Sequence, residues 1–172
     1  MDGQPFGEWY RTEHPKLLRV LVVVAGSTAE AAEVVDEAFA RAYERWERVS
    51  RMKSPTGWTY RTALNLVRRR GRRAAMESLL LRRSAEQRLW GSPPADWSPE
   101  VWEGLRALPV RERTAIALRY VADLSVQDIA VAMAIAPGTV GSTLHSARRH
   151  LAALLGDERP VVPLTDLEVR DA

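Results

Sequence analysis

Residues 108–155 read LPVRERTAIALRYVADLSVQDIAVAMAIAPGTVGSTLHSARRHLAALL, and this stretch is the most informative part of the sequence. Its apolar residues recur at helical spacing, and the pattern breaks twice, just before Leu124 and again at Pro137, which divides the stretch into three short helices. Ser125 and Asp128 can cap the start of the middle helix, while Pro137 suits the first turn of the last one. Short helices joined by tight turns predict a helix-turn-helix unit, whose last helix can enter the major groove of DNA.

The composition of the chain limits the remaining possibilities. Its 172 residues are 46% hydrophobic, which is enough for packed cores and typical of a globular protein. The absence of cysteine excludes disulfides, thiol catalysis and cysteine-bound zinc or iron-sulfur sites, and it fits a reducing compartment. The longest apolar run, residues 20–25, is too short to span a bilayer, and no signal peptide is visible. We therefore expect a cytoplasmic protein without membrane insertion.

Charge is distributed unevenly in the first half of the chain, although the net charge is only +3. Six arginines and no acidic residue lie between residues 61 and 73, whereas six acidic residues lie between residues 30 and 47. A solvated helix usually intersperses charges of both signs, so the basic stretch favours a polyanionic partner such as nucleic acid.

Two helical blocks flank a linker. In the first block, Pro15 is expected to kink or divide the opening helix, Gly26 ends it, and Ser27 opens a capping box for a long amphipathic helix. Ser54 and Pro55 begin a third helix that carries the arginines. No strand pattern is visible, so we expect an all-α fold of two small helical domains. The expected organisation is a first domain at 1–75, a linker at 76–97, a helix-turn-helix domain at 98–156 and a flexible tail at 157–172.

In this order the two halves resemble the extracytoplasmic-function sigma factors, which are small two-domain sigma factors of bacterial RNA polymerase. Residues 30–43 resemble the acidic helix of that family, and residues 58–67 are similar to its promoter-melting helix. Residues 108–155 look like its C-terminal DNA-binding domain. Two motif sets in the expected order are more specific than either set alone. The resemblance implies a promoter-specificity subunit of RNA polymerase.

The resemblance also implies partners. The acidic helix of the family docks on the clamp helices of the largest polymerase subunit, and Glu33, Asp36, Glu37 and Arg41 occupy the matching face here. The flap of core polymerase, promoter DNA and an anti-sigma protein are the other partners that the family implies. No cofactor or metal is implied, and the bond-forming chemistry would be left to the core enzyme, so the chain is not expected to be an enzyme.

The basic helix would bind the minus-ten promoter element as the DNA opens. Unstacked bases need aromatic or amide partners and phosphates need cations, and the helix offers both kinds of side chain. Trp58 and Tyr60 are two residues apart and so lie on different faces, which means that at least one belongs to the core; we favour Trp58 as the core residue. The candidate minus-ten residues are Trp58, Tyr60, Arg61, Asn65, Arg68, Arg69 and Arg72.

The last helix of the second domain would enter the major groove of the minus-thirty-five element. Its candidate DNA-binding residues are Thr139, Ser142, His145, Ser146, Arg148 and Arg149. Here the chain departs from the family pattern, because Gly141 and Thr143 stand where cations are usual, Ala134 replaces the turn glycine and Ala136 replaces the capping serine. Two missing cations should lower affinity and its salt dependence. We therefore expect this domain to bind its element weakly or to read an unusual sequence.

Three other functions are alternatives to a promoter-specificity subunit. Catalysis is disfavoured because the chain has only three histidines and no phosphate-cradling glycine loop, and because His145 and His150 do not share a helix face. A stand-alone helix-turn-helix regulator would bind DNA without polymerase. A sigma-like interaction protein would bind polymerase without initiating transcription.

Overall fold

The computed structural model describes residues 5–80, 91 and 97–156, and all regular secondary structure in this part of the chain is helical, as predicted. The first half consists of α1 (Phe6–Ala25), α2 (Thr28–Glu44), α3 (Trp46–Val49) and α4 (Pro55–Leu80). The second half consists of α5 (Pro99–Ala107), α6 (Val110–Ile116), the π-helical turn η1 (Ala117–Val121), α7 (Val126–Met133) and α8 (Pro137–Leu155).

Local signals set the ends of the first helices. Gly26 ends α1 in the left-handed region at φ 74°, where glycine is unstrained, and the Ser27 hydroxyl accepts a hydrogen bond from the Glu30 amide at the start of α2. Pro15, which we expect to kink or divide the helix, lies inside a continuous α1 and does not divide the helix. Burial of Trp9 before it and of Leu17 after it outweighs the cost of the missing backbone bond.

The second half has the predicted helix-turn-helix arrangement. The Ser125 hydroxyl accepts a hydrogen bond from the Asp128 amide, which confirms the predicted cap of α7. A turn of three residues, 134–136, separates α7 from α8, which begins at Pro137. Val140 and Leu144 are buried on the inner face of α8, which packs against α6 and α7. The opposite face of α8 is left outside the core.

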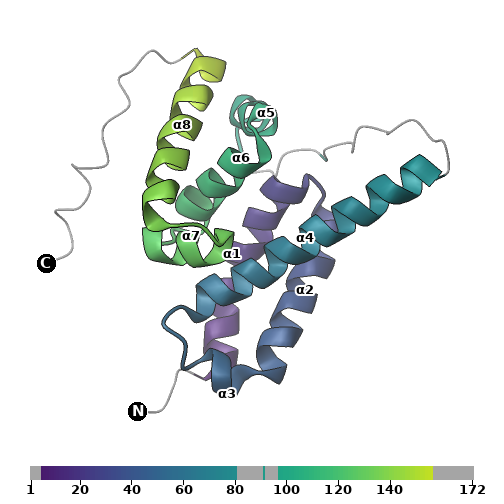
Figure 1. Ribbon diagram of the computed structural model, residues 1–172, viewed down its shortest axis with the longest axis vertical. Coiled ribbons are helices and arrows are strands. Elements are labelled where there is room, and N and C mark those ends of the chain that lie inside the picture. Colours follow the sequence, from purple (N-terminus) through teal and green to yellow (C-terminus); the bar gives the residue numbers. More distant parts are fainter. Residues whose placement is uncertain (1–4, 81–90, 92–96, 157–172) are drawn as a thin grey trace, which may run out of the picture.

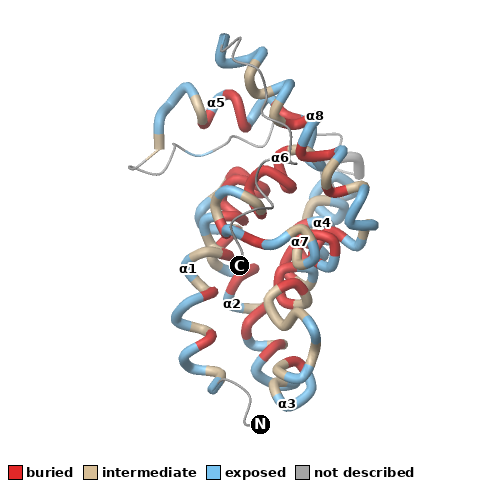
Figure 2. The backbone as a smooth tube through the Cα atoms, turned by 90° about the vertical axis from the view of Figure 1, so that its left-hand side faces the viewer, coloured by how far each residue is buried: buried red, intermediate tan, exposed pale blue. Residues whose placement is uncertain are grey.

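The two halves pack directly against each other. α7 lies against the start of α4, and α1 also contacts α6 and η1, so one hydrophobic core runs through both halves (Figures 1 and 2). α4 continues through Leu80, five residues beyond the predicted end of the first domain. Most of the predicted linker, 81–90 and 92–96, and the predicted tail, 157–172, lie outside the described residues.

Candidate nucleic-acid interface

The inner face of α4 belongs to the core. Tyr60, Ala63, Leu64 and Val67 follow one another at intervals of three, one and three residues, and all four are buried. Tyr60 has no exposed surface, and its hydroxyl lies 3.5 Å from Glu13 Oε2. Burial, followed by the nearby Glu13 carboxylate, raises the pKa of the Tyr60 phenol well above its usual range. In this structure Tyr60 offers no surface to a DNA base.

Trp58 is the more accessible of the two aromatic residues, since its side chain is half-buried at the edge of the core. The prediction that at least one of the two belongs to the core is confirmed, but Tyr60 and not the favoured Trp58 is the fully buried residue. The signal was present in the sequence: the residues three and four positions after Tyr60 are Ala63 and Leu64, whereas those after Trp58 are Arg61 and Thr62.

The outer stripe of α4 carries the other predicted minus-ten residues. The last four of these residues lie four, seven, eight and eleven positions after the first, so the five share one face of the helix, and all are exposed. Arg68 donates a weak hydrogen bond of 3.4 Å to the Asn65 side-chain oxygen, which links an amide to a cation. The stripe contains no acidic residue. It consists of Arg61, Asn65, Arg68, Arg69 and Arg72.

A third face of α4 meets the acidic helix α2. Arg70 Nη1 lies 2.8 Å from Glu33 Oε2, and its Nη2 lies 3.3 Å from Glu37 Oε2. Glu37 also accepts a hydrogen bond of 2.6 Å from Arg41. The basic and acidic stretches of the sequence therefore meet along one edge of α4, where Arg70 is neutralised by its own chain.

The predicted polymerase-binding residues remain accessible despite these pairs. The side chains of Glu33 and Asp36 are 70% and 72% exposed, and Asp36 Oδ1 lies 3.4 Å from His14 Nε2. Exposed pairs of this kind contribute little to stability, so a partner with basic groups can exchange with them at small cost. The face of α2 thus keeps a negative surface that suits a basic partner.

The outer stripe of α8 consists of Ser142, His145 and Arg149, which are exposed and spaced by three and four residues. The other predicted DNA residues on this helix are less free. Thr139 and Arg148 are half-buried, and Arg148 donates to the Leu144 carbonyl within α8. The stripe therefore holds a single permanent cation.

Ser146 points toward α6 instead of toward solvent. Its hydroxyl donates to Glu112 Oε1 at 2.8 Å, and His150 Nδ1 lies 2.6 Å from Glu112 Oε2. The Glu112 side chain is only 13% exposed. This carboxylate positions α8 on α6, and the sequence analysis missed it, because 34 residues separate Glu112 from Ser146 and nothing local signals their contact.

The four departures from the family pattern lie in the turn between α7 and α8 and in the first half of α8. Ala134 ends α7 in the left-handed region, with φ 56° and ψ 48°, where glycine has no steric cost. Ala136 precedes α8 without any side-chain cap. Thr143 is 8% exposed, and its hydroxyl donates to the Thr139 carbonyl, so a cation at this position would not reach the outer stripe without rearrangement. Gly141 is half-buried.

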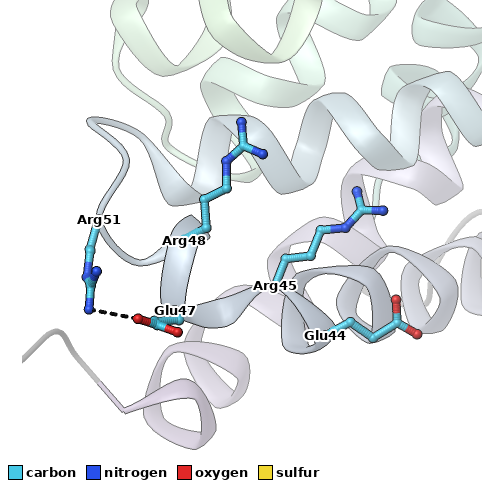
Figure 3. A pocket seen from close by; sticks show the side chains of 5 residues that line it. All are labelled: Glu44, Arg45, Glu47, Arg48 and Arg51. Atoms are coloured by element: carbon cyan, nitrogen blue, oxygen red, sulfur yellow. Dashed lines mark hydrogen bonds and ion pairs between the residues drawn. The ribbon is translucent and has the colours of Figure 1, made fainter.

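One surface hollow lies beside α3. The hollow between α2 and the loop after α3 is lined by Glu44, Arg45, Glu47, Arg48 and Arg51, which are all exposed (Figure 3). Arg51 pairs with Glu47 at 3.1 Å. Within residues 5–80, 91 and 97–156 no group of three acidic or histidine side chains could hold a metal ion.

The same residues contain no single helix that is long and apolar enough to cross a membrane. α7 and α8 taken together pass by length and composition, but they are bent by 96°.

Comparison with known proteins matches both halves. Residues 9–76 fit the family model of sigma-70 region 2 and residues 99–151 fit that of sigma-70 region 4, which together cover more than two thirds of the chain. The chain is 26% identical to the RNA polymerase sigma-E factor of Streptomyces coelicolor over 152 residues, covering 85% of this chain and 83% of the relative. It is 27% identical over 171 residues to the ECF RNA polymerase sigma factor SigW of Bacillus subtilis, covering 91% of each.

Two solved structures share the fold. The sigma factor RpoE of Bartonella quintana, solved with the anti-sigma factor NepR, superposes with a TM-score of 0.72 at 21% identity over 90% of this chain and 98% of that one. CnrH, solved with the cytosolic domain of CnrY, gives a TM-score of 0.61 at 21% identity over 89% and 88%. The chain belongs to the sigma-70 family, in its extracytoplasmic-function group, and is an RNA polymerase sigma factor that directs promoter-specific initiation of transcription.

Proposed function

We propose that the outer stripe of α4 binds the minus-ten element of the promoter and holds its opened strand. The observation that carries this proposal is the stripe itself, in which four exposed arginines and one exposed asparagine share a face without any acidic residue. The arginines suit phosphates, and the Asn65 amide suits a base edge. Trp58, half-buried beside the start of the stripe, supplies an aromatic surface for an unstacked base.

The outer stripe of α8 is proposed to enter the major groove of the minus-thirty-five element. Ser142, His145 and Arg149 would face the bases and phosphates, with Thr139 and Arg148 at the margins. Ser146 would act indirectly, because its hydrogen bond to Glu112 fixes the rotation of the helix. With one permanent cation on its face, α8 should bind duplex DNA weakly by itself.

The acidic face of α2 is proposed to dock on basic helices of core polymerase through Glu33, Asp36, Glu37 and Arg41. Charge complementarity of this kind makes association fast and sensitive to salt. The chain would then act in the cytoplasm beside the polymerase, which performs all bond-forming chemistry. Because the Bartonella relative was solved with an anti-sigma factor, we expect an anti-sigma protein to control this chain as well.

Replacing Arg68, Arg69 and Arg72 together with alanine tests the role of α4. Run-off transcription on fragmented genomic DNA, with purified core polymerase and sequencing of new 5′ ends, first identifies the starts that depend on the unchanged chain. On the strongest of these, the triple variant should lose open-complex formation, measured by permanganate reactivity of unpaired thymines, while it still co-purifies with core.

A matched triple variant controls for the loss of charge. Arg11, Arg106 and Arg111 are exposed arginines of α1, α5 and α6, so their replacement with alanine removes the same charge from other surfaces. This control should open the promoter normally. Simultaneous loss of core binding and opening in the α4 variant, with circular dichroism unchanged, would mean that the stripe docks on polymerase and would overturn its assignment to DNA.

A further inference from the structure

One carboxylate of α6 holds α8 at two points, and we call this group of three side chains the carboxylate anchor. Glu112 accepts a hydrogen bond of 2.8 Å from the Ser146 hydroxyl on one of its oxygens. The other oxygen lies 2.6 Å from Nδ1 of His150. Because a carboxylate only accepts hydrogen bonds, the His150 ring must donate from Nδ1. Little of the Glu112 side chain reaches solvent, so both bonds are largely shielded from water.

The two bonds hold α8 against both rotation and sliding. Ser146 and His150 are four residues apart, so they lie on the same side of α8 and about 6 Å apart along its axis. A single carboxylate bonded at both points resists rotation of the helix about its axis and movement along it. Apolar contacts such as those of Val140 and Leu144 have no comparable direction. The core therefore selects which face of α8 is buried, and the carboxylate anchor sets its rotation more finely.

The start of α8, which carries the DNA-facing residues, is held less firmly. Ala136 precedes the helix without a side-chain cap, and a Cβ atom on Gly138 would meet no atom within 4 Å. The hydroxyls of Ser142 and Thr143 both donate to the Thr139 carbonyl, so these bonds stay within α8 itself. The start of the helix thus takes its orientation from the carboxylate anchor, which lies one to two turns later.

This orientation matters because the outer stripe of α8 is poor in charge. Of its three residues, Ser142 and His145 can recognise a base only by directional hydrogen bonds, whereas the Arg149 guanidinium suits phosphate. At a helix radius of about 5–6 Å, a rotation of about 20° moves a side-chain tip by about 2 Å. A displacement of this size breaks a hydrogen bond to a base edge.

We propose that Glu112 is a positioning residue that determines how selectively the chain reads the minus-thirty-five element, although it does not contact DNA. The proposal rests on the assignment of α8 to that element. Ser146 and His150 act through Glu112, so neither has to face the groove. Loss of the carboxylate anchor lowers discrimination at the minus-thirty-five element and leaves the polymerase-binding face of α2 and the outer stripe of α4 unaffected.

Run-off transcription with core polymerase on two templates measures this discrimination. Both templates carry the strongest run-off start, one with its minus-thirty-five element intact and the other with that element scrambled. In parallel reactions the unchanged chain should favour the intact template. Glu112→Ala should reduce the ratio of the two yields by at least about five-fold, which is the contribution of one good base contact. The yield from the scrambled template should not change.

A conservative variant and a stability control separate positioning from folding. In Glu112→Gln the amide oxygen can accept from Ser146 and the amide nitrogen can donate to a neutral His150 ring, so this variant should restore the ratio. Val35→Ala removes buried apolar atoms from α2, far along the chain from the carboxylate anchor. It should lower stability and leave the ratio unchanged.

Combined variants test whether Ser146 acts through Glu112. Ser146→Ala alone removes one bond of the carboxylate anchor and should lower the ratio less than Glu112→Ala does. Added to Glu112→Ala, it should have no further effect, because the bond is already lost. A further loss in the double variant would mean that Ser146 contacts DNA directly and would contradict the proposal.

Two other results would overturn the proposal. An unchanged ratio in Glu112→Ala shows that α8 keeps its orientation without the carboxylate anchor. Equal loss of yield on both templates, without restoration by Glu112→Gln, shows that Glu112 serves folding alone. In both cases the unchanged chain still discriminates, so the assignment of α8 survives. If the unchanged chain uses both templates equally, that assignment fails and the inference fails with it.

Discussion

The two helices that we assign to DNA expose very different surfaces. The outer stripe of α4 presents four arginines and an asparagine, whereas the outer stripe of α8 presents a serine, a histidine and one arginine. Phosphate contacts supply most of the salt-dependent affinity for DNA, and polar contacts to base edges supply selectivity. The difference indicates that the first half provides most of the binding energy, while the second half selects among sequences.

The largest expected effect is on stability, and it tests whether DNA binding is confined to the outer face of α4. Tyr60→Ala removes a fully buried ring and should lower the free energy of unfolding by about 3–5 kcal/mol, measured by urea denaturation. Trp58→Ala, at the edge of the core, should cost less stability and should instead weaken binding to a single-stranded minus-ten oligonucleotide. Normal stability of Tyr60→Ala with defective promoter opening would assign Tyr60 to DNA after all.

The salt dependence of binding compares the two stripes directly. Removal of Arg68, Arg69 and Arg72 should reduce the slope of log affinity against log salt by about 2 for single-stranded DNA. Arg149→Ala should reduce the slope for minus-thirty-five duplex by no more than about 1. Fluorescence anisotropy at several salt concentrations measures both slopes. Equal changes would remove the contrast between the helices.

Alkaline pH probes the buried side of α4 alone. The pKa of Tyr60 is raised in the folded chain, so folding keeps the phenol protonated while the unfolded chain ionises near pH 10. This residue's stabilisation is fully present below pH 10 and falls by about 1.4 kcal/mol per pH unit above it. Tyr60→Phe should lose that part of the dependence. Identical alkaline unfolding of both chains would contradict the burial of the phenol.

The smallest expected effect concerns the turn that presents α8. Ala134→Gly relieves a left-handed alanine and should stabilise the chain by about 1 kcal/mol, whereas glycine at the exposed helical position Ala153 should destabilise it by a similar amount. Thermal unfolding followed by circular dichroism distinguishes the two. If Ala134→Gly instead destabilises the chain, the turn has a different conformation in solution.

Much of the fold could be predicted because its signals are local. Ser27, Ser125 and Pro137 mark helix starts through bonds or constraints within a few residues, and the structure confirms each of them. The relative burial of Trp58 and Tyr60 could also be predicted locally, because apolar residues stand three and four positions after Tyr60 but not after Trp58.

The missed features depend on contacts between distant segments. The local sequence gives no signal that Ser146 bonds to Glu112, or that Gly57 in the first turn of α4 packs against α7. Both contacts form only when the helices pack. A glycine in the first turn of a helix reads as a weak helix former until the neighbouring helix is known. The sequence likewise does not distinguish Arg70 from the other arginines of the basic stretch, because its ion pair with Glu33 depends on the packing of α4 against α2.

Arg70 gives this fold a tolerance to sequence drift. Because its guanidinium is shared between Glu33 and Glu37, the loss of either carboxylate leaves the arginine with a partner, and Arg41 stays beside Glu37 when Arg70 itself is lost. Descendants of this chain can therefore exchange these acids one at a time without leaving Arg70 unpaired. The acidic face of α2, which we propose binds polymerase, can thus change by single substitutions while an ion pair still holds the basic helix α4 against α2.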